Sequence, residues 1–143
     1  MKKAVFISIF LLASAAPSFA DETCSQVRNT PQAPKNFLAH KNPLKPTKKN
    51  LEEGRKLYYQ ERKELGCVQC HGEKGDGQGK MAPGLVPPPQ NFSCAPAMNK
   101  IKDGQMFWII QNGSAGTGMY TYAYLKDKEI WQLILYIRQF SKK

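Results

Sequence analysis

The segment Cys67-Val68-Gln69-Cys70-His71 constrains the fold more than any other part of this chain. Two cysteines separated by two residues, with a histidine directly after the second, form a C-x-x-C-H motif, the attachment signal for a c-type haem. The two thiols can add to the two vinyl groups on one edge of a haem, and the histidine is then held beneath the iron as an axial ligand. The motif therefore predicts one covalently bound haem c, anchored by Cys67 and Cys70 and ligated by His71.

A C-x-x-C pair alone would also suit a zinc ion or a thioredoxin-like dithiol. Zinc needs four protein ligands, or three and a water molecule, but the remaining candidates Cys24, Cys94 and His40 are isolated in the sequence. A redox dithiol belongs at the start of a helix within a βαβ pattern, and the sequence shows no such pattern around the motif. Haem attachment is therefore favoured over both alternatives.

Residues 1–20 have the features of a secretory signal peptide. A positively charged start precedes an apolar stretch over residues 4–16, and Ser18-Phe19-Ala20 is a small-x-small cleavage site. The apolar stretch is short for a membrane anchor, which is the alternative interpretation. We expect cleavage after Ala20 and export to the periplasm, a compartment in which haem c is attached in bacteria.

The mature chain would be one small, basic domain with an extension. The sequence has 21 Lys and Arg against 11 Asp and Glu, a net charge of +10, and loss of the signal peptide removes two lysines. This charge predicts steering toward acidic partner surfaces, whereas export and the lack of a basic–aromatic stripe argue against nucleic acid. Residues 21–49 are rich in Pro and Lys and predict an extended coil, and residues 50–143 predict the compact domain.

Three segments predict helices around the motif. Residues 51–65 follow Asn50 as a plausible N-cap, and residues 104–112 lie between Asp103 as cap and Gly113 as stop. Residues 127–140 are apolar nearly all round, which indicates burial on more than one face, with Lys126 and Asp127 competing for the N-cap. The glycine-rich loop 72–80 lacks the ending of a phosphate-binding loop, and we expect its glycines to let it pass close to the haem edge.

The sixth iron ligand has several candidates in the sequence. Met119 is favoured because it ends a flexible run between two helices, so its loop can fold over the distal face of the haem. Met98 and His40 are the alternatives. Met106 falls on an apolar helix face and is expected in the core, and Met81 follows the motif too closely to reach the opposite face easily. A thioether ligand favours reduced iron and raises the reduction potential relative to two histidines.

Taken together, these elements resemble the class I cytochromes c. The resemblance is carried by Gly54 and Tyr58 before the motif, by the motif, and then by Gly75-Asp76-Gly77-Gln78-Gly79, Pro83, residues 113–119 and residues 129–138. It implies an all-α, cytochrome c-like fold of three to four helices around one haem, in which the first and last helices cross near Gly54, Tyr58, Leu133 and Tyr136. It also implies His71 and Met119 as axial ligands and the carbonyl of Pro83 as acceptor of a hydrogen bond from His71. Family members usually have proline directly after the ligand methionine, where this chain has Tyr120.

The two remaining cysteines, Cys24 and Cys94, lie outside this pattern. In an oxidising compartment they would most simply form a disulfide, which would clip residues 21–49 onto the domain and stabilise it by about 4 kcal/mol at most. Two free thiols, one engaging a sulfur substrate or a partner, are the alternative.

The first functional hypothesis is a soluble, monomeric electron carrier that meets acidic redox partners transiently and reaches the membrane only through a partner complex. No carboxylate pair or nucleophile constellation is visible, so we expect no enzyme activity from the protein itself. The alternatives are a cytochrome c subunit of a larger periplasmic oxidoreductase, with residues 21–49 as a docking arm, and a haem enzyme or gas sensor with a labile sixth ligand.

Overall fold

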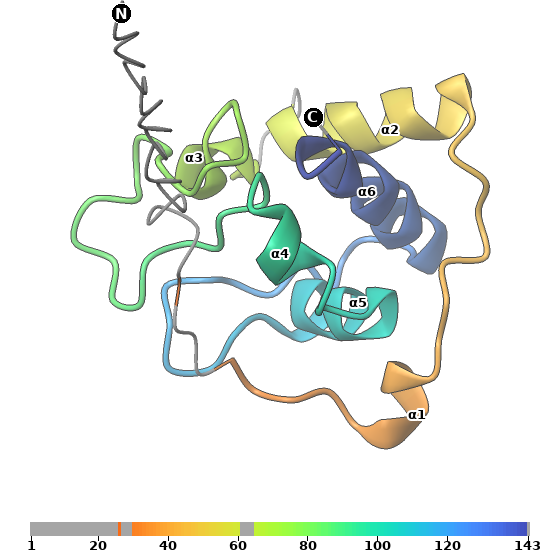
Figure 1. The fold of residues 1–143 in the computed structure, drawn as a ribbon, viewed down its shortest axis with the longest axis horizontal. Coiled ribbons are helices and arrows are strands. Elements are labelled where there is room, and N and C mark those ends of the chain that lie inside the picture. The colour runs from red at the N-terminus through yellow and green to blue at the C-terminus, as the bar shows by residue number, and fades with distance from the viewer. Residues whose placement is uncertain (1–25, 27–29, 61–64, 143) are drawn as a thin grey trace, which may run out of the picture.

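The computed structural model describes residues 26, 30–60 and 65–142. All regular elements within these residues are helices, so the all-α class is confirmed. The three longer helices are α2 (Lys48–Tyr59), α5 (Asp103–Asn112) and α6 (Asp127–Phe140), and the three single-turn helices are α1 (Lys35–Leu38), α3 (Val68–His71) and α4 (Ala95–Met98) (Figure 1). In this part of the chain no helix has both the length and the apolar character to cross a bilayer. The predicted signal peptide lies outside the described residues.

Helices α2 and α6 cross in close contact at Gly54 (Figure 1). A Cβ at this position would collide with the carbonyl oxygen of Gln132 and would lie 2.9 Å from Cβ of Tyr136. One turn later, the fully buried ring of Tyr58 lies 5.5 Å from the ring of Tyr136. The predicted crossing of the first and last long helices is therefore confirmed, and the absence of a side chain at Gly54 permits it.

The ends of the helices differ in part from prediction. Helix α2 begins at Lys48, and its N-cap is Thr47, whose hydroxyl accepts from the backbone N–H of Asn50 at 3.3 Å. The prediction that Asn50 is the N-cap of this helix is therefore wrong. Helix α5 includes Asp103 as its first residue instead of using it as a cap. At the start of α6 the N-cap is Lys126, whose backbone N–H donates to the carboxylate of Glu129 at 2.9 Å.

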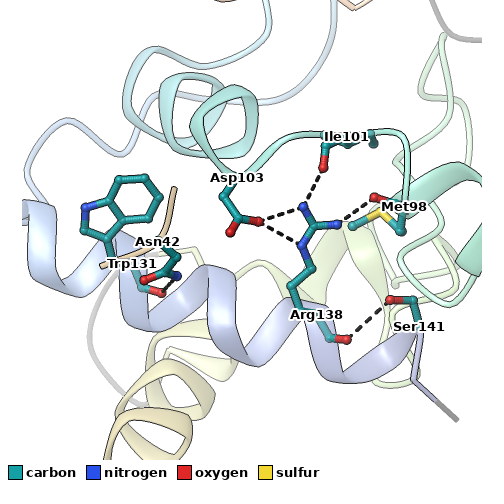
Figure 2. Close-up of polar contacts among 7 residues, drawn as sticks. All are labelled: Asn42, Met98, Ile101, Asp103, Trp131, Arg138 and Ser141. Atoms are coloured by element: carbon teal, nitrogen blue, oxygen red, sulfur yellow. Dashed lines mark hydrogen bonds and ion pairs between the residues drawn. The ribbon is translucent and has the colours of Figure 1, made fainter. Parts of the chain in front are cut away.

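Arg138 joins the end of α6 to the turn between α4 and α5 (Figure 2). Its guanidinium pairs with Asp103 at 2.7 Å and donates to the backbone carbonyl of Met98 at 2.6 Å and to that of Ile101. The planar guanidinium carries five N–H donors in a fixed arrangement and thereby binds all three acceptors at once. Arg138 thereby binds a carbonyl at the C-terminal end of α4, where the last carbonyls of a helix have no partner within it, and a second carbonyl in the turn that follows.

Residues 30–46, which we call the strap, run along the domain and do not hang free (Figure 1). The side-chain amide of Gln105 accepts from the N–H of Ala33 at 2.8 Å and donates to the carbonyl of Pro31 at 2.9 Å. Further along, the ring of Phe37 stacks at 6.2 Å on Phe107 of α5. Next, Asn42 donates to the carbonyl of Trp131 in α6 at 2.9 Å (Figure 2). The predicted coil is thus interrupted by α1 and held by specific contacts.

Candidate functional site

Helix α3 presents both cysteines of the motif to one cleft. Cys67 is its N-cap, and the backbone N–H groups of Cys70 and His71 donate to the carbonyl of Cys67 at 3.2 and 2.8 Å. Cys67 and Cys70 carry free thiols, and both line the cleft. Loss of hydration raises the pKa of Cys67 to about 12 and also raises the pKa of Cys70. The two thiols therefore stay protonated near neutral pH, one turn apart on the same side of the backbone.

The imidazole of His71 is 9 % exposed and has a defined orientation. Its Nδ1 lies 3.0 Å from the carbonyl oxygen of Gln90, and its ring stacks on Phe92 at 4.2 Å with an interplanar angle of 15°. A carbonyl oxygen can only accept, so Nδ1 carries the proton and Nε2 is the acceptor nitrogen of the neutral ring. This tautomer suits binding of a metal through Nε2.

The backbone carbonyl next to His71 differs from the expected one. The resemblance implied Pro83, but Pro83 is exposed, and the carbonyl within hydrogen-bond distance belongs to Gln90. The reason is the path of the chain between α3 and α4. The N–H of Phe92 donates to the carbonyl of Gly75 at 2.6 Å, which folds residues 89–92 back onto the end of α3.

The glycine-rich loop after the motif wraps over α3 itself. Gly77 N–H donates to the carbonyl of His71 at 2.9 Å, and Gly79 N–H donates to that of Cys70 at 3.1 Å. A Cβ on Gly79 would collide with the carbonyl oxygen of Gln69. This glycine is therefore needed for close approach of the loop to the backbone of α3.

The cleft lies between two loops and α3. One loop leads from α3 to α4 and the other from α5 to α6, and both extend on the α3 side of the view in Figure 1. The lining is mainly apolar, and the side chains that bear on haem chemistry are Cys67, Cys70, His71 and Met119. A mainly apolar lining with a few polar side chains is typical of a cofactor site.

The loop that carries Met119 is shaped by Thr117. The hydroxyl of Thr117 donates to the carbonyl of Ser114 at 2.8 Å and accepts from the N–H of Met119 at 3.1 Å. The N–H of Ser114 in turn donates to the carbonyl of Met119 at 3.2 Å. This turn gives the methionine a fixed backbone although Tyr120 stands where the family usually has proline. Thr117 was missed in the sequence, where a threonine two residues before a candidate ligand is the signal for such a turn.

The other candidates for the sixth ligand do not line this cleft. Met98 is fully buried in the core, and Met106 is 7 % exposed within the same core, as expected for Met106. His40 is exposed beside the strap residue Phe37, and Met81 is 45 % exposed. Met119 alone among the candidates shares the cleft with the motif.

Cys94 is buried and takes part in a disulfide. Its expected partner, Cys24, lies outside the described residues, so the pairing of Cys24 with Cys94 stays a prediction.

The residues of the cleft fit a haem c. Two protonated thiols, an imidazole whose tautomer makes Nε2 its acceptor nitrogen, and a thioether meet in one mainly apolar cleft. In residues 26, 30–60 and 65–142 no cluster of three His, Cys, Asp or Glu side chains is arranged to hold a metal ion.

Comparison with known proteins agrees with this chemistry. A search of the curated proteins finds no match. Among solved structures, a chain of the reducing HAO-like protein complex of Kuenenia stuttgartiensis aligns with a TM-score of 0.56 and 27 % identity over 72 % of this chain. The alignment covers 48 % of that chain, so this protein spans about half its length. The family model for cytochrome c matches residues 51–141, which include the motif, the cleft, all of α6 and most of α2. With this match over most of its length, the chain belongs to the cytochrome c family and carries a covalently bound haem c.

Proposed function

We propose that this protein is an exported electron carrier in which Cys67 and Cys70 hold one haem c, and His71 and Met119 ligate its iron. When bound, the haem supplies a one-electron Fe(III)/Fe(II) couple. The single observation that carries the proposal is the meeting of these four side chains in one cleft. Export with cleavage after Ala20 agrees with the usual compartment of cytochrome c domains.

Each residue of the cleft has a distinct part in this function. Cys67 and Cys70 retain the cofactor covalently, and His71 is oriented by its hydrogen bond to Gln90. The thioether of Met119 favours the reduced state, because it is a softer and more weakly donating ligand than imidazole. Prolines 87–89 and Leu85 line the same cleft and exclude water from it. Six-coordinate iron suits a carrier because little has to move when the electron is transferred.

Two exposed apolar side chains lie beside this cleft. Val86, next to the lining residues Leu85 and Pro87, is 84 % exposed, and the lining residue Tyr120 is 65 % exposed. With a mature net charge of +8, such a surface suits brief contacts with an acidic redox partner.

Replacing Met119 by Ala tests the ligand set. In the oxidised parent protein we expect the weak absorption band at the red edge of the visible spectrum that marks a methionine–iron(III) bond. The band should vanish in Met119→Ala and persist in the control Met81→Ala, because Met81 lies outside the cleft. A parent without this band, whose reduced form binds carbon monoxide readily, would contradict the carrier and support a haem enzyme or gas sensor.

A second candidate function is a subunit of a larger oxidoreductase. It is favoured by the likeness to a chain from a complex, and that chain is about twice as long as the matched region. The electron-transfer chemistry would be unchanged, but the partner would be permanent. Measuring the native mass of the protein purified from its own cells separates the two: a monomer supports the carrier, and a stable complex supports the subunit.

A further inference from the structure

Gln26 connects the N-terminal extension to the segment beside the haem-ligating histidine. Its side-chain Nε2 donates to the carbonyl of Pro89 at 3.1 Å, and its Oε1 accepts from the N–H of Asn91 at 2.9 Å. One amide thus pairs with the backbone on both sides of a single residue, Gln90. The contact joins positions more than sixty residues apart in the sequence, and Gln26 is half-buried.

The residue between these two contacts is the one that orients His71. The carbonyl of Gln90 lies 3.0 Å from Nδ1 of His71. The peptide groups on either side of Gln90 are therefore held by Gln26, while the carbonyl of Gln90 itself is directed at the imidazole. Movement of this short segment would lengthen or bend the Nδ1–H···O bond, and hydrogen bonds weaken steeply with such distortion.

We infer that Gln26 is a positioning residue for His71 and thereby adjusts the reduction potential of the haem. The inference rests on the proposed role of His71 as an axial ligand. A well-formed hydrogen bond from Nδ1 makes the imidazole a more basic ligand, which favours Fe(III) and lowers the potential. Loss of the two contacts of Gln26 loosens that bond and raises the potential.

The test compares the full haem-loaded protein with its Gln26→Met variant, which keeps the length of the side chain but removes both hydrogen bonds. We expect the equilibrium between Fe(III) and Fe(II) to shift about threefold toward Fe(II). This corresponds to a rise of about 28 mV, because a one-electron couple changes by 59 mV per tenfold. Exchange of the His71 Nδ1 proton with solvent, followed by NMR in the reduced protein, should be at least about tenfold faster, because the hydrogen bond protects this proton.

Gln105→Met is the matched control. Gln105 holds the strap with the same pair of amide contacts, to Ala33 and Pro31, but it lies on α5 and does not touch the segment beside His71. We expect this variant to keep the parent potential and the parent exchange rate. Equal changes in both variants would indicate a general loosening and would overturn the inference.

The outcomes separate this inference from the proposed function. If the reduced parent protein shows no iron-bound His71 resonance, the proposed function is wrong and the inference falls with it. If the resonance is present and Gln26→Met leaves the potential and the proton exchange at parent values, only the role of Gln26 is wrong.

Discussion

Gly54 sets the distance between the two longest helices. Its hydrogen atom faces the carbonyl of Gln132, where any side chain would be inside van der Waals contact. A glycine inside a helix costs about 1 kcal/mol relative to alanine in an isolated helix. In this fold glycine is more favourable than alanine at position 54, because the contact with α6 leaves no room for a methyl group.

Gly54→Ala should therefore destabilise the haem-loaded protein by about 2–3 kcal/mol. The measurement is the free energy of unfolding from a denaturant titration followed by helical circular dichroism. Lys56→Ala is the control, because Lys56 is exposed on the same helix and its ion pair with Glu53 contributes about 0.5 kcal/mol or less. Gly54→Ala with parent stability would contradict the close crossing.

At the scale of elements, α6 contacts two other long helices and the turn between α4 and α5. It crosses α2, contacts α5 through Trp131 and Phe107, whose rings lie 4.5 Å apart, and reaches the α4–α5 turn through Arg138 (Figure 2). Tyr136 lies on the α2 side of this helix, and its ring is close to those of Tyr58 and Tyr59. Burial, followed by a hydrogen bond with Tyr59, raises the pKa of Tyr136 to about 12.

This raised pKa predicts a loss of stability in alkali. In the unfolded chain a tyrosine ionises near pH 10, whereas in the folded protein Tyr136 stays neutral until about pH 12. The contribution of the neutral side chain is therefore complete below pH 10 and is lost as the pH rises to about 12. Because Tyr136 is partly exposed, solvent screening limits this loss to about 1 kcal/mol.

The variant Tyr136→Phe should lack the loss of stability in alkali that ionisation of Tyr136 causes. Urea titrations at pH 9 and near pH 11.5 measure it, and the drop in the free energy of unfolding between them should be smaller in Tyr136→Phe than in the parent. Tyr120→Phe is the control for loss of a tyrosine hydroxyl, because Tyr120 is 65 % exposed. If the free energy of unfolding fell equally in the parent and in both variants, the raised pKa of Tyr136 would be contradicted.

At the scale of the whole molecule, the strap and the helical domain form one packed unit. The strap contacts α5 at Ala33 and Phe37 and contacts α6 at Asn42. The strap itself lies outside the segment that matches the cytochrome c family, residues 51–141. The strap, which precedes the matched segment, thus covers part of α5 and of α6.

Deletion of residues 21–46 should leave haem attachment intact but lower the free energy of unfolding by about 3 kcal/mol. Of the contacts that are lost, the three hydrogen bonds of the strap contribute about 1 kcal/mol each, and the two hydrogen bonds of Gln26 and the packing of Phe37 are removed as well, so this value is a lower limit. A Cys24→Ala/Cys94→Ala double variant separates the contribution of the predicted disulfide, because it keeps the strap. Unchanged stability of the deletion variant would show that the strap is dispensable.

The sequence correctly predicted features that depend on residues close together in the chain. The spacing of Cys67, Cys70 and His71 places all three on one turn, and the apolar pattern of residues 127–140 matches α6 to the residue. Capping was less predictable. Asn50 and Thr47 can both cap a helix, but the side chain of Asn50 accepts from Gln132 of α6 at 3.0 Å, so Thr47 is the cap.

The sequence by itself determined the family, the attachment motif and the long helices, because these depend on short spacings and on residue type. Only the tertiary structure decided that Gln90 faces His71, that Thr117 shapes the loop of Met119, and that Gln26 holds both neighbours of Gln90. A backbone carbonyl has no side-chain signature, and an amide side chain can pair with any peptide group. Their partners are set by which segments the folded chain brings together, and no local pattern records that.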